Sequence, residues 1–279
     1  MRTSVAPTEI GVGSKHAPET VVTETNAPAN GVAPPGRAAL VFNDISMRFP
    51  DGTVALKNAT FSVHPGEFVT VVGPSGCGKS TLLRIASGLI QHSGGQVAVD
   101  RNSLGYVFQD ATLLKWRTVQ GNVELMAELS GVDKAERARL ASDVIDLVGL
   151  RGFENKYPKQ LSGGMRMRCS LARALVMDPK VFLFDEPFGA LDEITRERLN
   201  DELLQLFLRQ RFAALFITHS IAEAVFLSTR VLVMSNRPGE IIGDFAIEFP
   251  YPRSPALRFD PDFAQLCGDV SLSLRDAHE

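Results

Sequence analysis

The segment from Gly73 to Thr81 constrains this chain more than any other feature of its sequence. It spells Gly-Pro-Ser-Gly-Cys-Gly-Lys-Ser-Thr and fits the phosphate-binding pattern G-x-x-x-x-G-K-[ST] without a mismatch. The β-branched, apolar run at 68–72 before it favours a buried parallel strand, and residues 79–87 after it favour a helix. This order of strand, glycine loop and helix predicts a triphosphate site rather than a glycine-rich turn without a ligand.

Each part of the loop has an expected task in holding phosphate groups. Glycines let the backbone turn tightly enough to aim its N–H groups at phosphate oxygens, and the following helix N-terminus adds partial positive charge. Lys79 is expected to reach the β- and γ-phosphates, and the hydroxyl of Ser80 is expected to bind Mg²⁺. The residues predicted to contact the nucleotide in this loop are Gly73, Pro74, Ser75, Gly76, Cys77, Gly78, Lys79, Ser80 and Thr81.

Composition limits the classes of partner. The chain has 279 residues, a hydrophobic fraction of 44% and a formal net charge of -3, which suits one large domain and gives no long-range attraction for nucleic acid. Three cysteines without paired spacing indicate neither a disulfide framework nor a zinc site, and they favour a reducing compartment. No apolar run is long enough to cross a membrane and the N-terminus lacks a signal-peptide core, so we expect a cytosolic protein.

The chain is predicted to divide into a tail, a main domain and an extension. Residues 1–37 are rich in Pro, Ala, Thr, Val and Gly without apolar periodicity, which predicts a disordered tail. Residues 38–249 contain the phosphate-binding loop and the motifs that follow it, and are expected to form the main domain. Residues 250–279 are an extension, in which Asp260 is expected to cap a short helix over 261–274.

A small β-region is expected before the phosphate-binding loop. Strands are predicted over 40–49 and 59–63, with a turn at 50–52. Phe49 ends the first strand, where its ring could stack on a purine base. An aromatic residue in a strand is more often simply part of the core.

Further strands are predicted after the loop, over 96–100 and 104–108. Gln109 follows the second of these at its carboxyl end. Ligands of open α/β sheets bind at that edge, so this glutamine could meet a metal ion or a water. An isolated glutamine there would more often cap a turn or lie on the surface.

Residues 111–178 are predicted to form a helical subdomain, with helical spacing over 118–129 and 133–148. The loop 111–116 before these helices is apolar and contains the only tryptophan, Trp116. Exposed apolar residues in a loop indicate a partner surface. The alternative is that they pack beneath the helix that follows.

A second candidate anion site closes the helical subdomain. Ser162 can cap the helix that follows it, and Gly163 and Gly164 leave the first N–H groups of that helix accessible. Such an open helix start can receive an anion. Taken alone, Ser-Gly-Gly before a helix is most often only a cap.

Two acids follow the apolar run at 181–184, which predicts a buried strand with Asp185 and Glu186 at its carboxyl tip. Asp185 could hold Mg²⁺ through water, and Glu186 could polarise an attacking water. An isolated acid pair would more often cap a helix. His219 ends another apolar strand, 213–218, where a lone histidine is usually structural.

The order of these motifs resembles that of the ATP-binding subunits of ABC transporters over residues 38–234. The resemblance implies an α/β fold: a P-loop NTPase core with a mainly parallel sheet, an N-terminal antiparallel β-subdomain and an inserted α-helical subdomain. It also implies ATP hydrolysis with Mg²⁺. The roles that it implies are adenine stacking by Phe49, magnesium and water sensing by Gln109, general base catalysis by Glu186, γ-phosphate contact by His219 and a dimer contact by Asp192.

The same resemblance implies a head-to-tail dimer. The helix that starts at Ser162, Gly163 and Gly164 in one subunit would face the γ-phosphate bound by a second copy or a paired ATPase subunit. ATP would hold the two subunits together, and hydrolysis would release them. This cycle would drive a transmembrane permease from the cytoplasmic face of the inner membrane, with a periplasmic solute-binding protein acting indirectly. Met165 departs from the family pattern because it replaces the usual glutamine.

Four shorter stretches, 113–119, 187–192, 219–227 and 237–239, resemble ATPases that import nitrate, sulfonates and taurine. The short tail agrees, since sugar, sulfate and polyamine import ATPases carry an extra β-domain. Importers of thiamine-precursor pyrimidines have similar ATPases, so the solute stays open. An exporter ATPase would share the same motifs. A soluble ABC ATPase would need tandem cassettes, a long coiled coil or a basic face, which this sequence does not show.

Overall fold

The computed structural model describes Met1 and residues 37–276, so the disorder expected for the N-terminal tail falls on residues outside this part. Every helix and strand of the described part belongs to one compact unit, residues 32–279.

A six-stranded sheet with the order β5-β6-β7-β3-β8-β9 forms the centre of this unit. Its first five strands run parallel, and β9 pairs antiparallel with β8. The strands are β3 (Phe68–Val72), β5 (Leu104–Val107), β6 (Val181–Asp185), β7 (Ala213–Ile217), β8 (Arg230–Met234) and β9 (Ile241–Ala246). Strands β3 and β7 are buried along their whole length, as expected for apolar runs in a parallel sheet that is covered on both faces.

A three-stranded antiparallel sheet, ordered β2-β1-β4, packs beside the first. Its strands are β1 (Leu40–Arg48), β2 (Val54–Val63) and β4 (Gly94–Val99). Strand β2 begins earlier than the residue 59 predicted from the sequence. Leu56 is buried and pairs with Met47, whereas the polar pair Lys57 and Asn58, with Asn58 at a positive φ of 49°, interrupts the apolar pattern.

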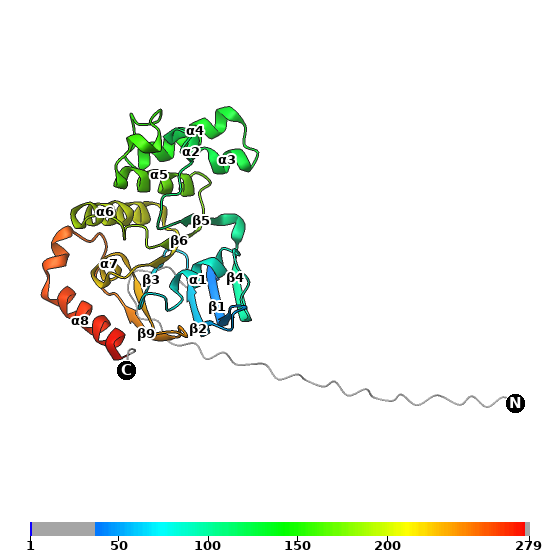
Figure 1. Ribbon diagram of the computed structural model, residues 1–279, viewed down its shortest axis with the longest axis vertical. Helices are drawn as coiled ribbons and strands as arrows, with labels where there is room; N and C mark the ends of the chain where they lie inside the picture. The colour runs from blue at the N-terminus through cyan, green and yellow to red at the C-terminus, as the bar shows by residue number, and fades with distance from the viewer. Residues whose placement is uncertain (2–36, 277–279) are drawn as a thin grey trace. The chain divides into compact units, whose positions relative to one another are not determined.

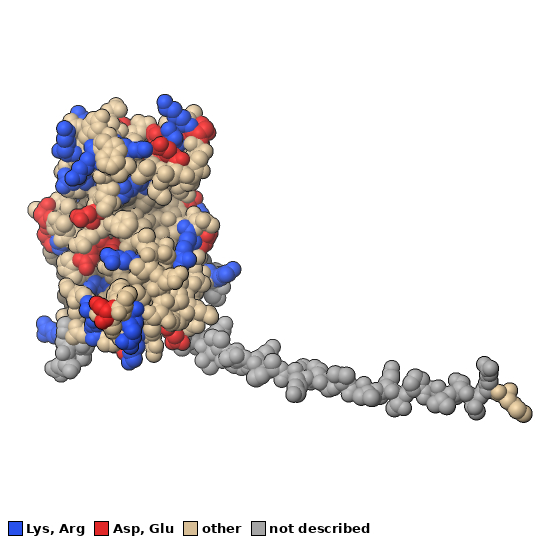
Figure 2. Space-filling model, turned by 45° about the vertical axis from the view of Figure 1, so that its right-hand side comes forward, with Lys and Arg blue, Asp and Glu red and all other residues tan. Residues whose placement is uncertain are grey.

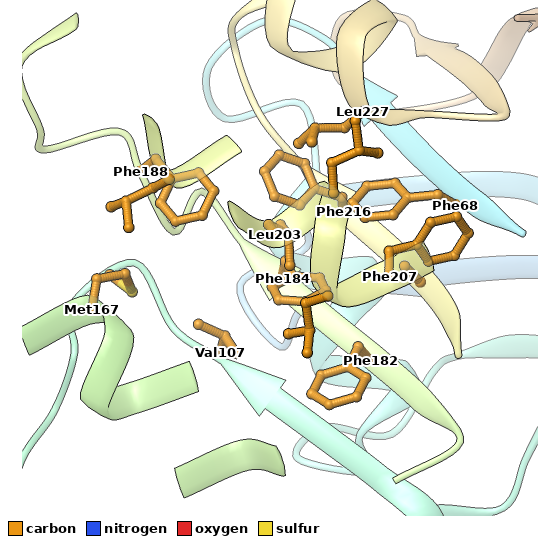
Figure 3. Packing of buried hydrophobic residues seen from close by; sticks show 14 of the residues in the cluster. Phe68, Val107, Met167, Phe182, Phe184, Phe188, Leu203, Phe207, Phe216 and Leu227 are labelled. Carbon is orange, nitrogen blue, oxygen red and sulfur yellow. The ribbon is translucent and has the colours of Figure 1, made fainter. Parts of the chain in front are cut away.

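Side chains of the central strands alternate between two cores, as the two-residue period of a strand requires. Phe68 and Phe184 point to one face, where their rings pack near Phe207 of helix α6 (Glu193–Gln210) (Figure 3). Val69 and Leu183 point to the other face, against helix α1 (Lys79–Ala86) and the antiparallel sheet. Full burial of one such phenylalanine contributes about 1.5–3 kcal/mol, so this double core fixes the strand ends that carry the polar residues.

Four helices form a separate layer at one end of the unit (Figure 1). They are α2 (Val119–Val123), α3 (Leu125–Leu129), α4 (Lys134–Leu147) and α5 (Gly163–Leu175). Among them, α5 lies nearest the sheet, and α6 lies between α5 and the sheet. The single helix predicted over 118–129 is therefore divided. Glu124, the residue at the division, keeps right-handed helical angles (φ -62°, ψ -17°), donates to Gln120 O and accepts from Glu128 N, so the chain direction is kept.

Two further helices cover the sheet on the C-terminal side. They are α7 (Ile221–Leu227) and α8 (Pro261–Asp276); strands β8 and β9 lie between them in the chain, and a 3-10 turn, Pro255–Phe259, leads into α8. Helix α8 has an apolar face against the core, because Phe263 and Val270 are buried and Leu266 packs against the same core. On the face drawn in Figure 2, basic and acidic side chains are interspersed over the described residues. Within residues 37–276, no helix is long and apolar enough to cross a membrane.

The predicted fold is confirmed: a mainly parallel α/β sheet, an antiparallel β-sheet built from flanking strands and an inserted group of helices. The order of the parallel strands matters for the site. The carboxyl ends of β3, β6 and β7 lie side by side, because these three strands are neighbours in the sheet.

Candidate nucleotide-binding site

The glycine loop connects the carboxyl end of β3 to the start of α1, as the sequence predicts. Gly76 and Gly78 have positive φ angles of 77° and 117°, a backbone region that L-residues with side chains rarely adopt. A side chain at Gly78 would also meet the Leu56 side chain at 2.7 Å and the Ala55 carbonyl at 2.8 Å. The motif glycine is therefore required both by its angle and by the strand of the antiparallel sheet that packs against it.

The ammonium group of Lys79 lies inside the loop rather than in solvent. Lys79 is 5% exposed, and its Nζ donates hydrogen bonds of 2.8 Å to the carbonyl oxygens of Gly73 and Pro74. The backbone N–H of Cys77 also points to the Pro74 oxygen, at 3.4 Å. Both groups are donors held inside the loop, and an ammonium group gathered with backbone N–H groups in a loop is suited to binding an anionic oxygen.

Asp185 joins the loop to the tip of β6. The Ser80 hydroxyl donates to Asp185 Oδ1 at 2.7 Å, and the phenol of Tyr106 donates to Asp185 Oδ2 at 3.2 Å. A hydroxyl and a carboxylate supply the hard oxygen ligands that Mg²⁺ prefers, so these residues fit that ion.

Tyr106 was not predicted as part of the site. Burial, with a further contribution from Asp185, raises its pKa far above the usual value, so the phenol keeps its proton and remains a donor. Its ring stacks on Phe108 with 4.0 Å between the centroids. The sequence feature that could have indicated this role is a tyrosine in an otherwise apolar strand, because a buried tyrosine hydroxyl needs a polar partner.

Glu186 and His219 are brought together by two adjacent strands. Asp185 pairs with Ile217 in the sheet, so the residues just beyond these strand ends are neighbours. His219 Nδ1 lies 3.0 Å from Glu186 Oε2. Glu186 has a positive φ of 45°, which is uncommon for a residue with a side chain and is found most often at functional sites. Its carboxylate stays 23% exposed, so water can reach it.

A buried acid supports the strand end before His219. The hydroxyl of Thr218 donates to Glu223 and accepts a 3.0 Å hydrogen bond from the backbone N–H of Ser220. Burial raises the pKa of Glu223, which favours its neutral form. These bonds fix the backbone on both sides of His219, so the imidazole projects from a rigid position.

Phe49 and Gln109 lie at the margins of this cluster. Phe49 is half-buried against the antiparallel core and begins the tight turn in which Gly52 donates to its carbonyl at 2.9 Å. Part of its ring is thus buried in the core and part is accessible, so packing in the core and stacking on a purine base are both compatible with its position. Gln109 is exposed directly after β5.

The second predicted group lies at the start of α5 and α6. Ser162 Oγ accepts a 3.2 Å hydrogen bond from Met165 N and caps α5 as predicted, and Asp192 Oδ1 accepts one of 3.0 Å from Thr195 N and caps α6, which was not predicted. A side chain on Gly163 would lie 3.2 Å from Leu191, and one on Gly164 would lie 3.2 Å from Thr195. The two helix starts are therefore in close contact.

This second group is separate from the glycine loop. Within residues 37–276, no hydrogen bond or ion pair joins Ser162, Gly163, Gly164 or Asp192 to the segment Gly73–Thr81. Met165, which departs from the family pattern, packs its side chain against the main core while its N–H serves the Ser162 cap.

The fold and the first cluster define a P-loop nucleoside triphosphatase with a helical insertion. A family model described as ABC transporter matches residues 56–189. The aliphatic sulfonates import ATP-binding protein SsuB of Bacillus cereus is 43% identical over 222 residues, covering 76% of this chain and 87% of that protein. The nitrate import ATP-binding protein NrtD of Synechocystis sp. is 43% identical over 235 residues, covering 80% and 88%.

A solved structure agrees with these relatives. The dimeric ATP-binding cassette MJ0796, in a post-hydrolysis state bound to ADP and Pi, is 30% identical with a TM-score of 0.66, covering 76% of this chain and all of that one. The chain therefore belongs to the ATP-binding subunits of ABC transporters. It is an ATPase of this class, as the resemblance implied.

Proposed function

We propose that this chain hydrolyses ATP to power an ABC importer for a small solute of the nitrate, sulfonate or taurine class. The observation that carries the proposal is the hydrogen-bonded set in which Ser80 meets Asp185 and Glu186 meets His219 beside the loop lysine. The import direction and solute class are supported by the two relatives, whose names state sulfonate and nitrate import.

Binding begins with the triphosphate. The backbone N–H groups of the glycine loop and the Lys79 ammonium bind the β- and γ-phosphates, and Lys79 Nζ exchanges its bonds to the Gly73 and Pro74 carbonyls for bonds to phosphate oxygens. The accessible part of the Phe49 ring stacks on the adenine. Ser80 and Asp185 hold Mg²⁺, and the chemistry that this ion supplies when bound is neutralisation of phosphate charge.

Hydrolysis then needs a water aligned with the γ-phosphorus. Glu186 accepts a hydrogen bond from this water and takes its proton as the new O–P bond forms and the bond to the β–γ bridging oxygen breaks. His219 orients the carboxylate from 3.0 Å and contacts the γ-phosphate, and Gln109 orients the water. The products are ADP and inorganic phosphate.

A second ATPase subunit completes the site. The Ser162–Gly164 helix start and Asp192 form a cap region that makes no hydrogen bond to the glycine loop of the same chain in the described residues. In the proposed head-to-tail dimer this helix start faces the γ-phosphate held by the other subunit. Closure removes water around the γ-phosphate, which strengthens every electrostatic contact to it.

The permease is proposed to dock on the loop that contains Trp116. Trp116 is 74% exposed, while Leu113 packs against the main core, so the two sequence-based alternatives each describe part of the loop. The fully buried Asn122 fixes the loop: its Oδ1 accepts from Leu114 N at 2.7 Å, and its Nδ2 donates to the carbonyls of Leu114 and Arg117 at 3.1 Å. A large aromatic side chain held out on a rigid loop is typical of an interface anchor.

Replacing Trp116 with alanine should weaken the complex with the permease by about 2 kcal/mol or roughly 30-fold in Kd, as for aromatic interface anchors. The measurement is copurification of the tagged permease with this subunit at limiting concentration. Phe259→Ala is the matched control, because Phe259 is 89% exposed in the C-terminal extension. Undiminished copurification of the Trp116 variant would remove the loop from the permease interface.

The proposed direction of transport is tested with the assembled complex. With this subunit at the cytoplasmic face of the membrane, the permease and the solute-binding protein are reconstituted in vesicles, and nitrate, taurine, alkanesulfonates and pyrimidines are supplied in turn. We expect one of the first three to stimulate ATP hydrolysis several-fold and to accumulate on the ATPase side. Movement away from that side would favour the exporter alternative, and activity that stays in the soluble fraction would favour a non-transport ABC ATPase.

A further inference from the structure

The turn after β8 is wedged between the glycine loop and the antiparallel sheet. The N–H of Gly239 donates to the Ala55 carbonyl at 2.9 Å, and Lys57 N donates to the Gly239 carbonyl at 3.0 Å. A side chain on Gly239 would meet the Cys77 carbonyl oxygen at 2.3 Å. The turn therefore touches the phosphate-binding loop on one side and β2 on the other.

Arg237, in this turn, holds one carbonyl of the glycine loop. Its Nε and Nη2 donate to the Gly76 oxygen at 3.1 and 2.7 Å, so two guanidinium N–H groups serve a single acceptor. The residue is exposed apart from this contact.

The Arg237 contact fixes the direction of a phosphate donor. In a planar trans peptide the C=O and the following N–H point in opposite directions. With the Gly76 oxygen held outward by Arg237, the Cys77 N–H points inward to Pro74 O, the same oxygen that accepts from Lys79 Nζ at 2.8 Å. A charged donor on the carbonyl also polarises the peptide and makes its N–H a stronger donor.

We propose that Arg237 is a positioning residue for the β-phosphate of a nucleoside di- or triphosphate: it orients the Gly76–Cys77 peptide and adds positive potential behind it. The proposal rests on the proposed ATP site. It assigns a role to Arg237 in the segment Arg237–Gly239, which lies outside the nucleotide-binding motifs. Because the effect acts on the bound phosphate before and after hydrolysis alike, it belongs to nucleotide binding rather than to the chemical step.

The test is equilibrium binding of ATP, ADP and adenosine to the full chain by titration calorimetry, with thermal unfolding measured without nucleotide. In Arg237→Ala we expect the Kd for ATP and ADP to rise about tenfold, as for loss of a charge-assisted hydrogen bond, and the Kd for adenosine to stay within twofold. Arg237→Lys, which keeps the charge and one donor, should recover part of the affinity. In the transport complex the KM for ATP should rise while kcat at saturating ATP is largely kept.

Lys57→Ala is the matched control, because it removes the 2.7 Å ion pair with Glu240 from the same turn without touching the glycine loop. Its nucleotide affinity should equal that of the unchanged chain. Equal affinities of Arg237→Ala and the unchanged chain for ATP and ADP would overturn the proposal, as would an equal loss of adenosine binding. Failure of the unchanged chain to bind either nucleotide would instead overturn the ATP site itself, and this assignment with it.

Discussion

Glu186→Gln should reduce ATP turnover of the assembled complex by about 10²–10⁴-fold, the usual contribution of a general base. The amide has the size of the carboxylate and keeps an oxygen within reach of His219, which lies 3.0 Å from Glu186 Oε2 in the unchanged chain. It cannot accept the proton of the attacking water at neutral pH. The measurement is phosphate release at saturating ATP.

The same variant should keep ATP binding and therefore accumulate the ATP-bound dimer. Size-exclusion chromatography with and without ATP detects this shift in apparent mass. Lys79→Ala provides the opposite control: it removes the ammonium that donates to Gly73 and Pro74, so both ATP binding and ATP-dependent dimerisation should be lost. A Glu186→Gln variant that hydrolyses ATP at the unchanged rate would remove Glu186 from the chemistry.

Local sequence patterns were sufficient for the elements that carry the site. The strand β3, the loop Gly73–Thr81 and the helix α1 follow one another within a short stretch, so composition and glycine spacing predict them directly. Asp185, Glu186 and His219 come from distant parts of the chain. Their proximity could be predicted from the sequence because each follows an apolar run, and parallel strands place their carboxyl ends at one edge of the sheet.

Contacts that depend on packing between elements were not predictable from the same patterns. Tyr106 reaches Asp185 only because β5 and β6 pair in a particular register, with Tyr106 opposite Leu183. The positive φ of Glu186 is a backbone state without a sequence signal at a residue that carries a side chain. Arg237 meets Gly76 across 161 sequence positions, through a turn that is held both by its own hydrogen bonds and by those to β2.

The way in which the start of the segment predicted as a helix over 118–129 is held also depends on residues outside it. The amide of Asn122 satisfies the backbone of the loop at Leu114 and Arg117, and the N–H groups of Val119 and Gln120 donate to the carbonyls of Lys156 and Glu154. These partners lie outside the helix, so helical spacing alone could not indicate how the segment is held. The same buried asparagine is what presents Trp116 on the surface.

Ser162→Asp should abolish ATP hydrolysis by the complex while nucleotide binding to the isolated chain stays within twofold. Aspartate is as good a helix cap as serine, so the α5 start that Ser162 holds through Met165 N at 3.2 Å should persist. In the proposed dimer the new carboxylate faces the γ-phosphate of the other subunit. Two like charges about 4 Å apart at an effective dielectric constant of roughly 20 repel by about 4 kcal/mol, or roughly 10³-fold in the stability of the closed state.

Ser162→Asn separates the effect of charge from that of shape, because asparagine has the size of aspartate, caps helices equally well and is neutral. We expect this variant to keep most of the ATPase activity and to dimerise with ATP, whereas the aspartate variant stays monomeric at every ATP concentration tested. Since Ser162 makes no hydrogen bond to its own glycine loop in the described residues, an effect on the isolated chain's affinity for ATP is not expected. Equal hydrolysis rates of the aspartate variant and the unchanged complex would mean that the α5 start does not face a nucleotide, and the shared site between two subunits would have to be abandoned.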